Sequence, residues 1–223
     1  MYLKGGGIYY MKKSLFILIV AAVTVLYGCN NNDSENNDEQ SLPAEDAEEV
    51  LSEVANESGE SFAEANMQNT AGDIIGNVRF YEEDQFILAE AMFEEGISSG
   101  FHGFHMHETG LCEPEAADGP FTTAGGHYNP EGSSHGNHPG DMTALYGLED
   151  GSSYLVTAID RLRPEQLINE DLAVIVHSDP NNFANIPDRY TSSESNSPGP
   201  DEETLSTGDA GSRTACGVIQ ASN

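Results

Sequence analysis

Short apolar runs separated by turn residues fill the chain from about Ser61 onward, and this pattern constrains the fold more than any other feature. Runs with the length and composition of strands cover 74–80, 86–93, 154–159 and 172–177. Turn-forming dipeptides such as Asp150-Gly151 lie between them, and only 163–169 favours a helical turn. Several short strands with regular turns predict an all-β domain, a sandwich or a barrel, over residues 61–223.

The segment 178–207 departs from this pattern because it is long and rich in Ser, Pro, Asn and acids. A loop of that length in a compact domain is usually functional or disordered. The hydrophobic fraction of the whole chain is 38%. That fraction, over a chain of this length, is enough for one domain with a real core.

The first 28 residues predict an export signal. From Met11, which we take as the start, the chain reads MKKSLFILIVAAVTVLYGC, with two lysines, an apolar run over 15–26, and then Gly28 and Cys29. This order is typical of a secretory signal peptide, and the apolar run is shorter than the roughly 20 residues that span a bilayer. Its end resembles the bacterial lipoprotein signal. We therefore expect lipidation at Cys29 and an extracytoplasmic protein anchored to the bacterial cell membrane, with an ordinary cleaved signal as the alternative.

Residues 29–60 predict a disordered tether between the lipid and the domain. Eleven acids lie between residues 30 and 60, among Asn, Ser and Gln and with few apolar side chains. Such a segment cannot bury enough apolar surface to offset the entropy lost on ordering.

The charge of the chain is strongly negative. Its 38 Asp and Glu stand against 8 Lys and Arg, and the three lysines all lie within the first 13 residues. Because nucleic-acid binding rests on Lys and Arg that displace counterions, we exclude nucleic acid as a partner. We hypothesise a salt-rich habitat, in which dense carboxylates keep the protein hydrated.

The three cysteines divide unequally. Cys29 is assigned to the lipid, so Cys112 and Cys216 remain as an even pair in an oxidising compartment. We expect a disulfide between them, with two free thiols as the alternative. The bond would close a loop of about 100 residues, which stabilises by about 4 to 5 kcal/mol in the chain-entropy account.

All seven histidines lie between His102 and His177. His105 and His107 stand two residues apart, and alternate side chains of a strand share a face. The pair offers two nitrogen ligands to one ion, although an H-x-H pair alone is more often an exposed polar strand face.

Further candidate ligands follow downstream: His127, His135, His138, Asp141 and His177. Imidazole suits zinc, copper, iron and nickel, and imidazoles mixed with a carboxylate are a common zinc set. Six histidines and one aspartate are too many for one tetrahedral ion. Two adjacent ions that share one imidazole would use them all.

Five segments occur in a fixed order: GFHGFHMHETGLCEP, AGGHYNP, SSHGNHPGDMTALY, VIVHSDPNNF and STGDAGSRTACGVI. Together they resemble the copper/zinc superoxide dismutases in their bacterial exported form, over roughly residues 80–219. The resemblance implies a Greek-key β-sandwich or barrel of immunoglobulin-like architecture with long metal-binding and electrostatic loops. It also implies one copper and one zinc cation per subunit.

The resemblance carries the metal ligands onto this chain. The copper ligands would be His105, His107, His127 and His177. The zinc ligands would be His127, His135, His138 and Asp141, with His127 as the bridge.

Other positions match the family as well. Cys112 and Cys216 match its disulfide, Arg213 matches its anion-guiding arginine, and Thr207 matches a position at the channel rim. His102 matches no ligand position, and we expect a hydrogen-bonded structural role for it.

Two positions depart from the family pattern. His135 and His138 are closer in sequence than in most members, which leaves the zinc occupancy open. Asn181 stands where the family has an Asp that hydrogen-bonds ligands of both metals, and losing such a partner typically costs 10- to 100-fold in metal affinity or activity.

The reaction implied by the resemblance converts superoxide into oxygen and hydrogen peroxide and protects the extracytoplasmic space. Arg213 would hold the anionic substrate, and His127 would gain and release a proton. The alternative is a non-catalytic metal-binding lipoprotein with the same fold. A copper-storage protein is disfavoured, because soft Met or Cys ligands suit Cu(I) and the expected copper ligands are all imidazoles. The resemblance leaves open whether the protein is a homodimer.

Overall fold

The structure, a computed structural model, describes residues 59–222. The expected signal peptide, the lipidated Cys29 and nearly all of the expected tether lie outside these residues. Among the described residues, no helix is both long and apolar enough to cross a membrane.

The described chain is built mainly from strands. They are β1 (Ala63–Asn69), β2 (Ile74–Glu82), β3 (Ile87–Phe93), β4 (Gly100–His102), β5 (Phe104–His107), β6 (Leu145–Gly147), β7 (Ser153–Ile159), β8 (Ala173–His177), β9 (Arg213–Val218) and β10 (Gln220–Ala221). The helical segments are short: η1 (Thr122–Ala124), α2 (Pro164–Asn169) and α3 (Glu202–Thr207). The predicted all-β class is confirmed.

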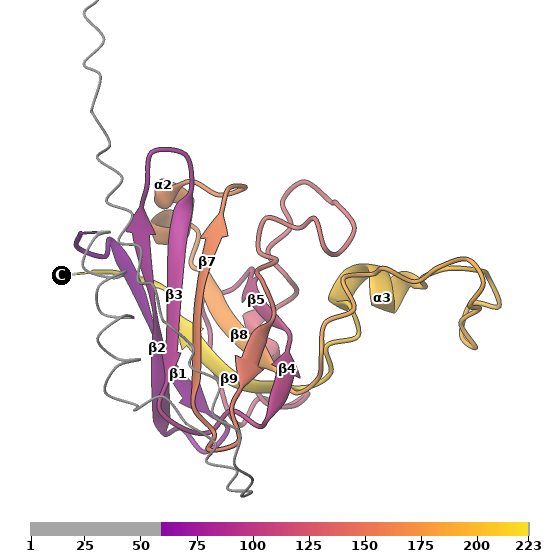
Figure 1. Ribbon diagram of the computed structural model, residues 1–223, viewed down its shortest axis with the longest axis horizontal. Helices are drawn as coiled ribbons and strands as arrows, with labels where there is room; N and C mark the ends of the chain where they lie inside the picture. The colour runs from indigo at the N-terminus through magenta and orange to yellow at the C-terminus, as the bar shows by residue number, and fades with distance from the viewer. Residues whose placement is uncertain (1–58, 223) are drawn as a thin grey trace, which may run out of the picture. The chain divides into compact units, whose positions relative to one another are not determined.

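Antiparallel pairing joins most strands into one curled sheet in the order β5-β8-β9-β1-β2-β3-β7, with β10 also paired to β1 (Figure 1). A second, two-stranded sheet pairs β4 with β6. It links the two edges of the large sheet, because β4 leads into β5 across Gly103 and β6 turns directly into β7. The connection from β7 to β8 crosses from one edge to the other side of the sheet, as in a Greek key.

The predicted strands correspond to β2, β3, β7 and β8, and the predicted helical turn corresponds to α2. We did not predict β1. Its buried side chains, Ala63, Ala65 and Met67, alternate with polar ones, but two of the three are too small to give a clear apolar signal. The 178–207 segment has no strand, ends in α3 and extends away from the sheet (Figure 1).

The two faces of β5 have different surroundings. Phe104 and Met106 are fully buried in the main core, together with Val174 and Val176 of β8. His105 and His107 pair with Ile175 and Ala173 and point to the other side, under the loops. The predicted sharing of a face by the two histidines is therefore confirmed, and the sheet positions them.

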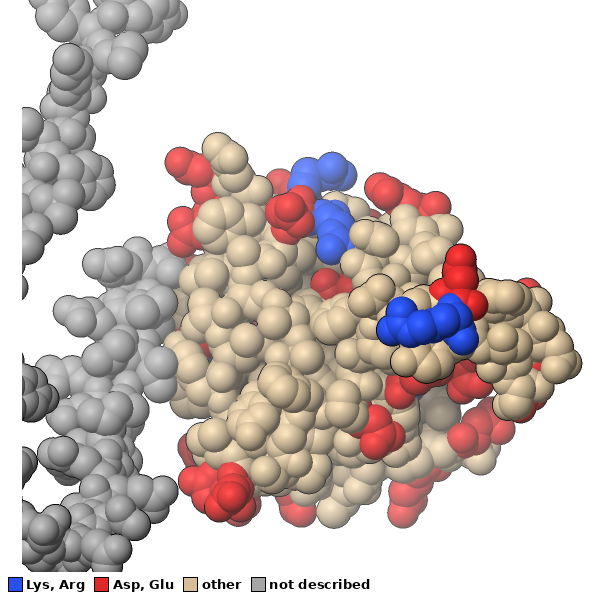
Figure 2. Space-filling view, turned by 45° about the vertical axis from the view of Figure 1, so that its right-hand side comes forward, with Lys and Arg blue, Asp and Glu red and all other residues tan. Residues whose placement is uncertain are grey.

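The surface carries the predicted excess of acids. Acidic side chains are scattered over the face in Figure 2, and the basic ones are few. The described residues contain arginine but no lysine.

Candidate metal centre

Four imidazoles meet above β5 and β8. The ligand nitrogens of His105, His107, His127 and His177 lie within 4.8 Å of one another, and all four residues are buried. Nε2 of His107 is 3.4 Å from Nε2 of His177. The rings of His105 and His127 are 4.1 Å apart between centroids. These are the residues predicted to bind copper, and we call them the four-imidazole group.

Backbone carbonyls orient two members of the four-imidazole group. Nδ1 of His107 is 3.0 Å from the Gly125 oxygen, and Nδ1 of His177 is 3.1 Å from the Gly211 oxygen. A carbonyl can only accept, so each Nδ1 carries the hydrogen and each Nε2 keeps its lone pair. Both Nε2 atoms are thus prepared to bind a metal.

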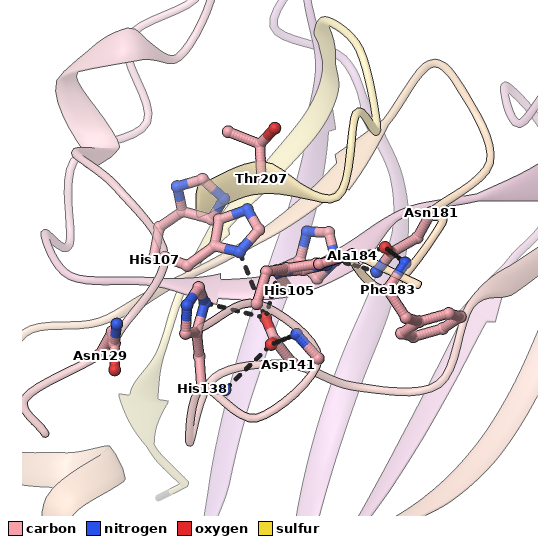
Figure 3. Close-up of polar contacts among 12 residues, drawn as sticks. His105, His107, Asn129, His138, Asp141, Asn181, Phe183, Ala184 and Thr207 are labelled. Atoms are coloured by element: carbon pink, nitrogen blue, oxygen red, sulfur yellow. Dashed lines mark hydrogen bonds and ion pairs between the residues drawn. The ribbon is translucent and has the colours of Figure 1, made fainter. Parts of the chain in front are cut away.

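The carboxylate of Asp141 contacts three histidines, one of which belongs to the four-imidazole group (Figure 3). Its Oδ1 lies 3.2, 3.2 and 3.4 Å from the Nδ1 atoms of His127, His135 and His138. Its Oδ2 accepts hydrogen bonds from the backbone N–H groups of Gly136 (2.7 Å) and His138 (3.0 Å). We call these four side chains the carboxylate group; they are the residues predicted to bind zinc.

The two groups overlap. His127 belongs to both, as a bridging ligand would, and His105 also lies within 4.8 Å of the ligand atoms of His127, His135 and Asp141. The structure therefore brings all seven candidate ligands together in one cluster. Which ion each of them binds stays a prediction.

Burial sets the protonation of this cluster. It lowers the pKa of His105, His107 and His127 below the ordinary value, and it lowers the pKa of His177 to about 4. Burial alone would raise the pKa of Asp141, but the close contacts of its carboxylate with the three imidazoles, His127 first among them, hold that pKa well below its usual range. Neutral imidazoles and an ionised carboxylate are the forms that bind metals.

The donor atoms fit copper and zinc. Among the residues that the structure describes, four buried nitrogens lack a hydrogen-bond partner: Nδ1 of His105, Nδ1 of His135, and both ring nitrogens of His138. Buried polar atoms are normally paired, and all four belong to the cluster. Imidazoles suit copper, and imidazoles with a carboxylate suit zinc.

Asn181 lies between the two groups. Its Nδ2 is 2.7 Å from Nε2 of His105, and its Oδ1 is 2.8 Å from Nε2 of His135. The structure thus places Asn181 in contact with a member of each group. The ring of Phe183 stacks on His135 at 6.4 Å between centroids, a contact that we did not predict.

Arg213, the first residue of β9, reaches the same place. Its Nη1 and Nη2 donate to the carbonyl oxygens of Phe121 and Gly125, both at 2.5 Å. The Gly125 oxygen therefore receives hydrogen bonds from both Arg213 and His107. We did not predict this role of Gly125, because a backbone carbonyl has no sequence signature.

A cavity of about 620 Å³ opens over the cluster. Arg213, Thr207 and three of the four imidazoles line it, and so do the acids Glu108, Glu203 and Asp209. Thr207 ends α3 and donates through its hydroxyl to the Glu203 carbonyl.

The predicted disulfide between Cys112 and Cys216 is confirmed. It ties the segment after β5 to β9, close to Arg213. His102 takes no part in either group; its ring nitrogens lie 2.8 and 2.7 Å from the carbonyl oxygens of His177 and Ser98. This agrees with the structural role expected for it.

Comparison with known proteins identifies a matching family and similar sequences. Residues 74–219 match the family described as copper/zinc superoxide dismutase (SODC). The chain is 45% identical over 132 residues to "Superoxide dismutase [Cu-Zn]" of Mycolicibacterium paratuberculosis, covering 56% of this chain and 58% of that protein. It is 44% identical over 130 residues to the protein of the same name from Mycobacterium tuberculosis, covering 55% of this chain and 54% of that one.

The matched region thus spans little more than half the length of these curated relatives. Among solved structures, the Cu/Zn superoxide dismutase from Brucella abortus aligns with a TM-score of 0.55 at 24% identity, over 71% of this chain and 99% of that one. At that identity the likeness shows the fold.

Proposed function

The chain belongs to the copper/zinc superoxide dismutase family, and from this premise we propose that it converts superoxide into oxygen and hydrogen peroxide. One observation carries the proposal: His107, His127, His177 and Arg213 line a single cavity. A metal-binding relative without activity would not need an arginine beside the imidazoles.

The proposed ligands divide as the geometry does. The four-imidazole group would hold copper, and the carboxylate group would hold zinc, with His127 shared. Bound copper would supply a one-electron couple that oxidises one superoxide and reduces the next, while bound zinc would orient the shared imidazole.

Arg213 would bind the substrate. A guanidinium has five N–H donors, and only two of its nitrogens are hydrogen-bonded to carbonyls here. The remaining N–H groups can hold an anion by charge-assisted hydrogen bonds. Since three acids line the same cavity, Arg213 is the group that makes the site attractive to superoxide.

His127 would handle the proton. Its Nδ1 faces Asp141 at 3.2 Å, so its Nε2 is the atom that can hold a proton next to the substrate. Burial lowers its pKa, and a weakly basic imidazole releases its proton readily to the peroxide.

The test is metal analysis together with a dismutase assay on protein loaded with copper and zinc. We expect one ion of each per chain and rapid removal of superoxide. Protein that binds both ions and removes no superoxide would disprove the activity but leave the metal sites intact.

We also propose that the protein is exported and anchored to the membrane through a lipid on Cys29. The residues from Met11 to Cys29 support this proposal. Mass spectrometry of the mature N-terminus would detect the lipid, and Cys29→Ser should release the protein from the membrane fraction. A wild-type N-terminus without lipid would contradict the anchor.

A further inference from the structure

We propose that Asn181 makes the two ligand groups unequal: its carbonyl supports His135 as a metal ligand, and its NH₂ group opposes metal binding at His105. The inference rests on the proposed function, because it concerns the same copper and zinc ligands.

The orientation of the Asn181 amide follows from three contacts. The side chain is buried, with 9% of its surface exposed. Its Oδ1 accepts a hydrogen bond from the backbone N–H of Phe183 at 2.7 Å and lies 2.8 Å from Nε2 of His135. Because a backbone N–H only donates, the oxygen must face Phe183 and His135. The NH₂ group therefore faces His105, at 2.7 Å (Figure 3).

The amide has little freedom to turn over. Reversal would place its NH₂ group against the N–H of Phe183, so that two donors would face each other and the bond from that N–H would be lost. Gly208 also packs against it: a Cβ there would stand 2.2 Å from Asn181 Oδ1 and 2.3 Å from His135 Nε2. Gly208 has a φ of 64°, in the left-handed region that favours glycine.

A neutral imidazole has one N–H donor and one nitrogen lone pair. His135 donates its Nε2–H to the amide oxygen, which leaves the Nδ1 lone pair free beside Asp141. That Nδ1 has no hydrogen-bond partner among the described residues. His135 is therefore held in the form that binds a metal through Nδ1.

His105 is held in the opposite form. The amide NH₂ group donates, so Nε2 of His105 must offer its lone pair, and the hydrogen must then sit on Nδ1. Nδ1 is the buried atom that lacks a partner and that a metal would need. To bind a metal there, His105 must move its hydrogen to Nε2, where two donors would then face each other.

The other strand histidines show the contrast. His107 and His177 each donate Nδ1–H to a backbone carbonyl, so their metal-binding nitrogens are already free. His105 is thus the one ligand of these three whose hydrogen-bond partner is of the wrong kind. We infer that the four-imidazole group binds copper more weakly than its residues allow, and that the carboxylate group does not share this penalty.

The test variant is Asn181→Asp, which offers an acceptor to both imidazoles. Copper and zinc dissociation constants are measured by competition with chelators on the purified protein. We expect copper affinity to rise by about 10- to 100-fold, and zinc affinity to rise much less. Asn185→Asp is the matched control, because it adds the same charge at an exposed position of the same loop, and it should change neither constant appreciably.

A second variant tests the two halves of the amide apart. Asn181→Ala removes the donor that opposes His105 and the acceptor that supports His135. We expect it to weaken zinc binding without weakening copper binding. The inference would be overturned if Asn181→Asp changed the affinities for copper and zinc equally, or if Asn185→Asp raised copper affinity as much as Asn181→Asp does. Either result would mean that position 181 acts only through its charge.

Nitrogen NMR of the metal-free protein provides a readout that needs neither metal nor activity. We expect the hydrogen of His105 on Nδ1 in the wild type and on Nε2 in Asn181→Asp. A wild-type hydrogen on Nε2 would overturn the inference. Failure of the wild type to bind copper or zinc would instead overturn the proposed function, while the position of the His105 hydrogen still decides the inference.

Discussion

The two ligand groups share His127 but rest on different parts of the fold. The four-imidazole group takes three of its members from β5 and β8, where paired strands fix their spacing. The carboxylate group lies in the 127–141 segment, which contains no strand. There Asp141 itself closes the turn through Gly136 and His138. The four-imidazole group, the sheet half of the centre, is thus positioned by paired strands. The carboxylate group, the loop half, is ordered largely by its own ligand Asp141.

The loop half is nevertheless attached to the sheet. Met106 accepts a hydrogen bond from Tyr128 and donates one to Gly140, both at 2.8 Å, and so holds the two ends of the 127–141 segment. These bonds fix where the segment begins and ends. What lies between depends on Asp141 and on the ion, so we expect the two halves to respond differently to change.

The largest expected effect concerns the bond that ties the loop after β5 to the sheet. Replacing both Cys112 and Cys216 with serine should lower the free energy of unfolding by about 4 to 5 kcal/mol, because their disulfide spans 104 residues. Urea unfolding measures it. A loss below about 1 kcal/mol would show that hydrogen bonds alone anchor the loop that holds Gly125.

The next prediction removes a metal ligand from the sheet half while the strand that carries it stays folded. His107→Gln removes one strand ligand, and we expect activity to fall by more than the roughly 100-fold that an outer hydrogen-bond partner costs. Zinc binding and the unfolding midpoint should change little, because β5 keeps its backbone pairing. A collapse of zinc binding in this variant would show that the halves are not independent.

Asp141→Asn breaks the loop half. The amide carries no charge and cannot replace both carboxylate oxygens as acceptors and ligands, so we expect zinc affinity to fall by about 10- to 100-fold and amide hydrogen exchange over 127–141 to accelerate. Copper binding should fall less. Asp118→Asn, at an exposed position, is the control for loss of charge. Unchanged exchange in Asp141→Asn would mean that the segment is ordered without its carboxylate.

The sequence could predict the sheet half better than the loop half. Short apolar runs identify β2, β3, β7 and β8, and the two-residue spacing places His105 and His107 on one face. His127, His135 and His138 could be named as candidate ligands from the clustering of the histidines, but only the family resemblance assigned them to an ion, since no local rule joins residues of a loop. The orientation of the Asn181 amide could not be predicted, because it depends on the N–H of Phe183 and on the close approach of Gly208.

Acid should affect the sheet half of the metal-free protein first. The pKa of His177 is lowered to about 4 in the folded state, so the unfolded chain binds more protons below the ordinary value of 6.5. Stability should therefore fall as the pH falls from 6.5 towards 4, by about 1.5 kcal/mol between pH 6.5 and 5 from this group alone. The low pKa of Asp141 keeps the carboxylate ionised throughout this range.

Urea midpoints at several pH values would measure that loss. Midpoints that stay constant from pH 6.5 to 5 would show that the strand histidines are not held neutral by burial. The variant His177→Gln should reduce the slope, since it removes one of the groups that take up a proton on unfolding.

The smallest expected effect concerns Arg213, which binds no metal but lines the cavity over both ligand groups. Arg213→Gln should lower kcat/KM by about tenfold, roughly the value of a hydrogen bond to a charged group. Arg189→Gln is the control, because that side chain is exposed and lies over Tyr190 rather than in the cavity. Equal losses in the two variants would show that only the overall charge matters.

Salt separates the local arginine from the acids around it. At about 1 M salt the Debye length falls to about 3 Å, so the acids scattered over the surface should no longer repel superoxide, while a contact with Arg213 should persist. Wild-type activity should stay constant or rise from low to molar salt, and Arg213→Gln should remain about as much less active than the wild type as it is at low salt. A steady fall of wild-type activity with no gain in stability would contradict the salt-rich habitat, and would mean that the attraction of Arg213 for the substrate acts over distances that salt can screen.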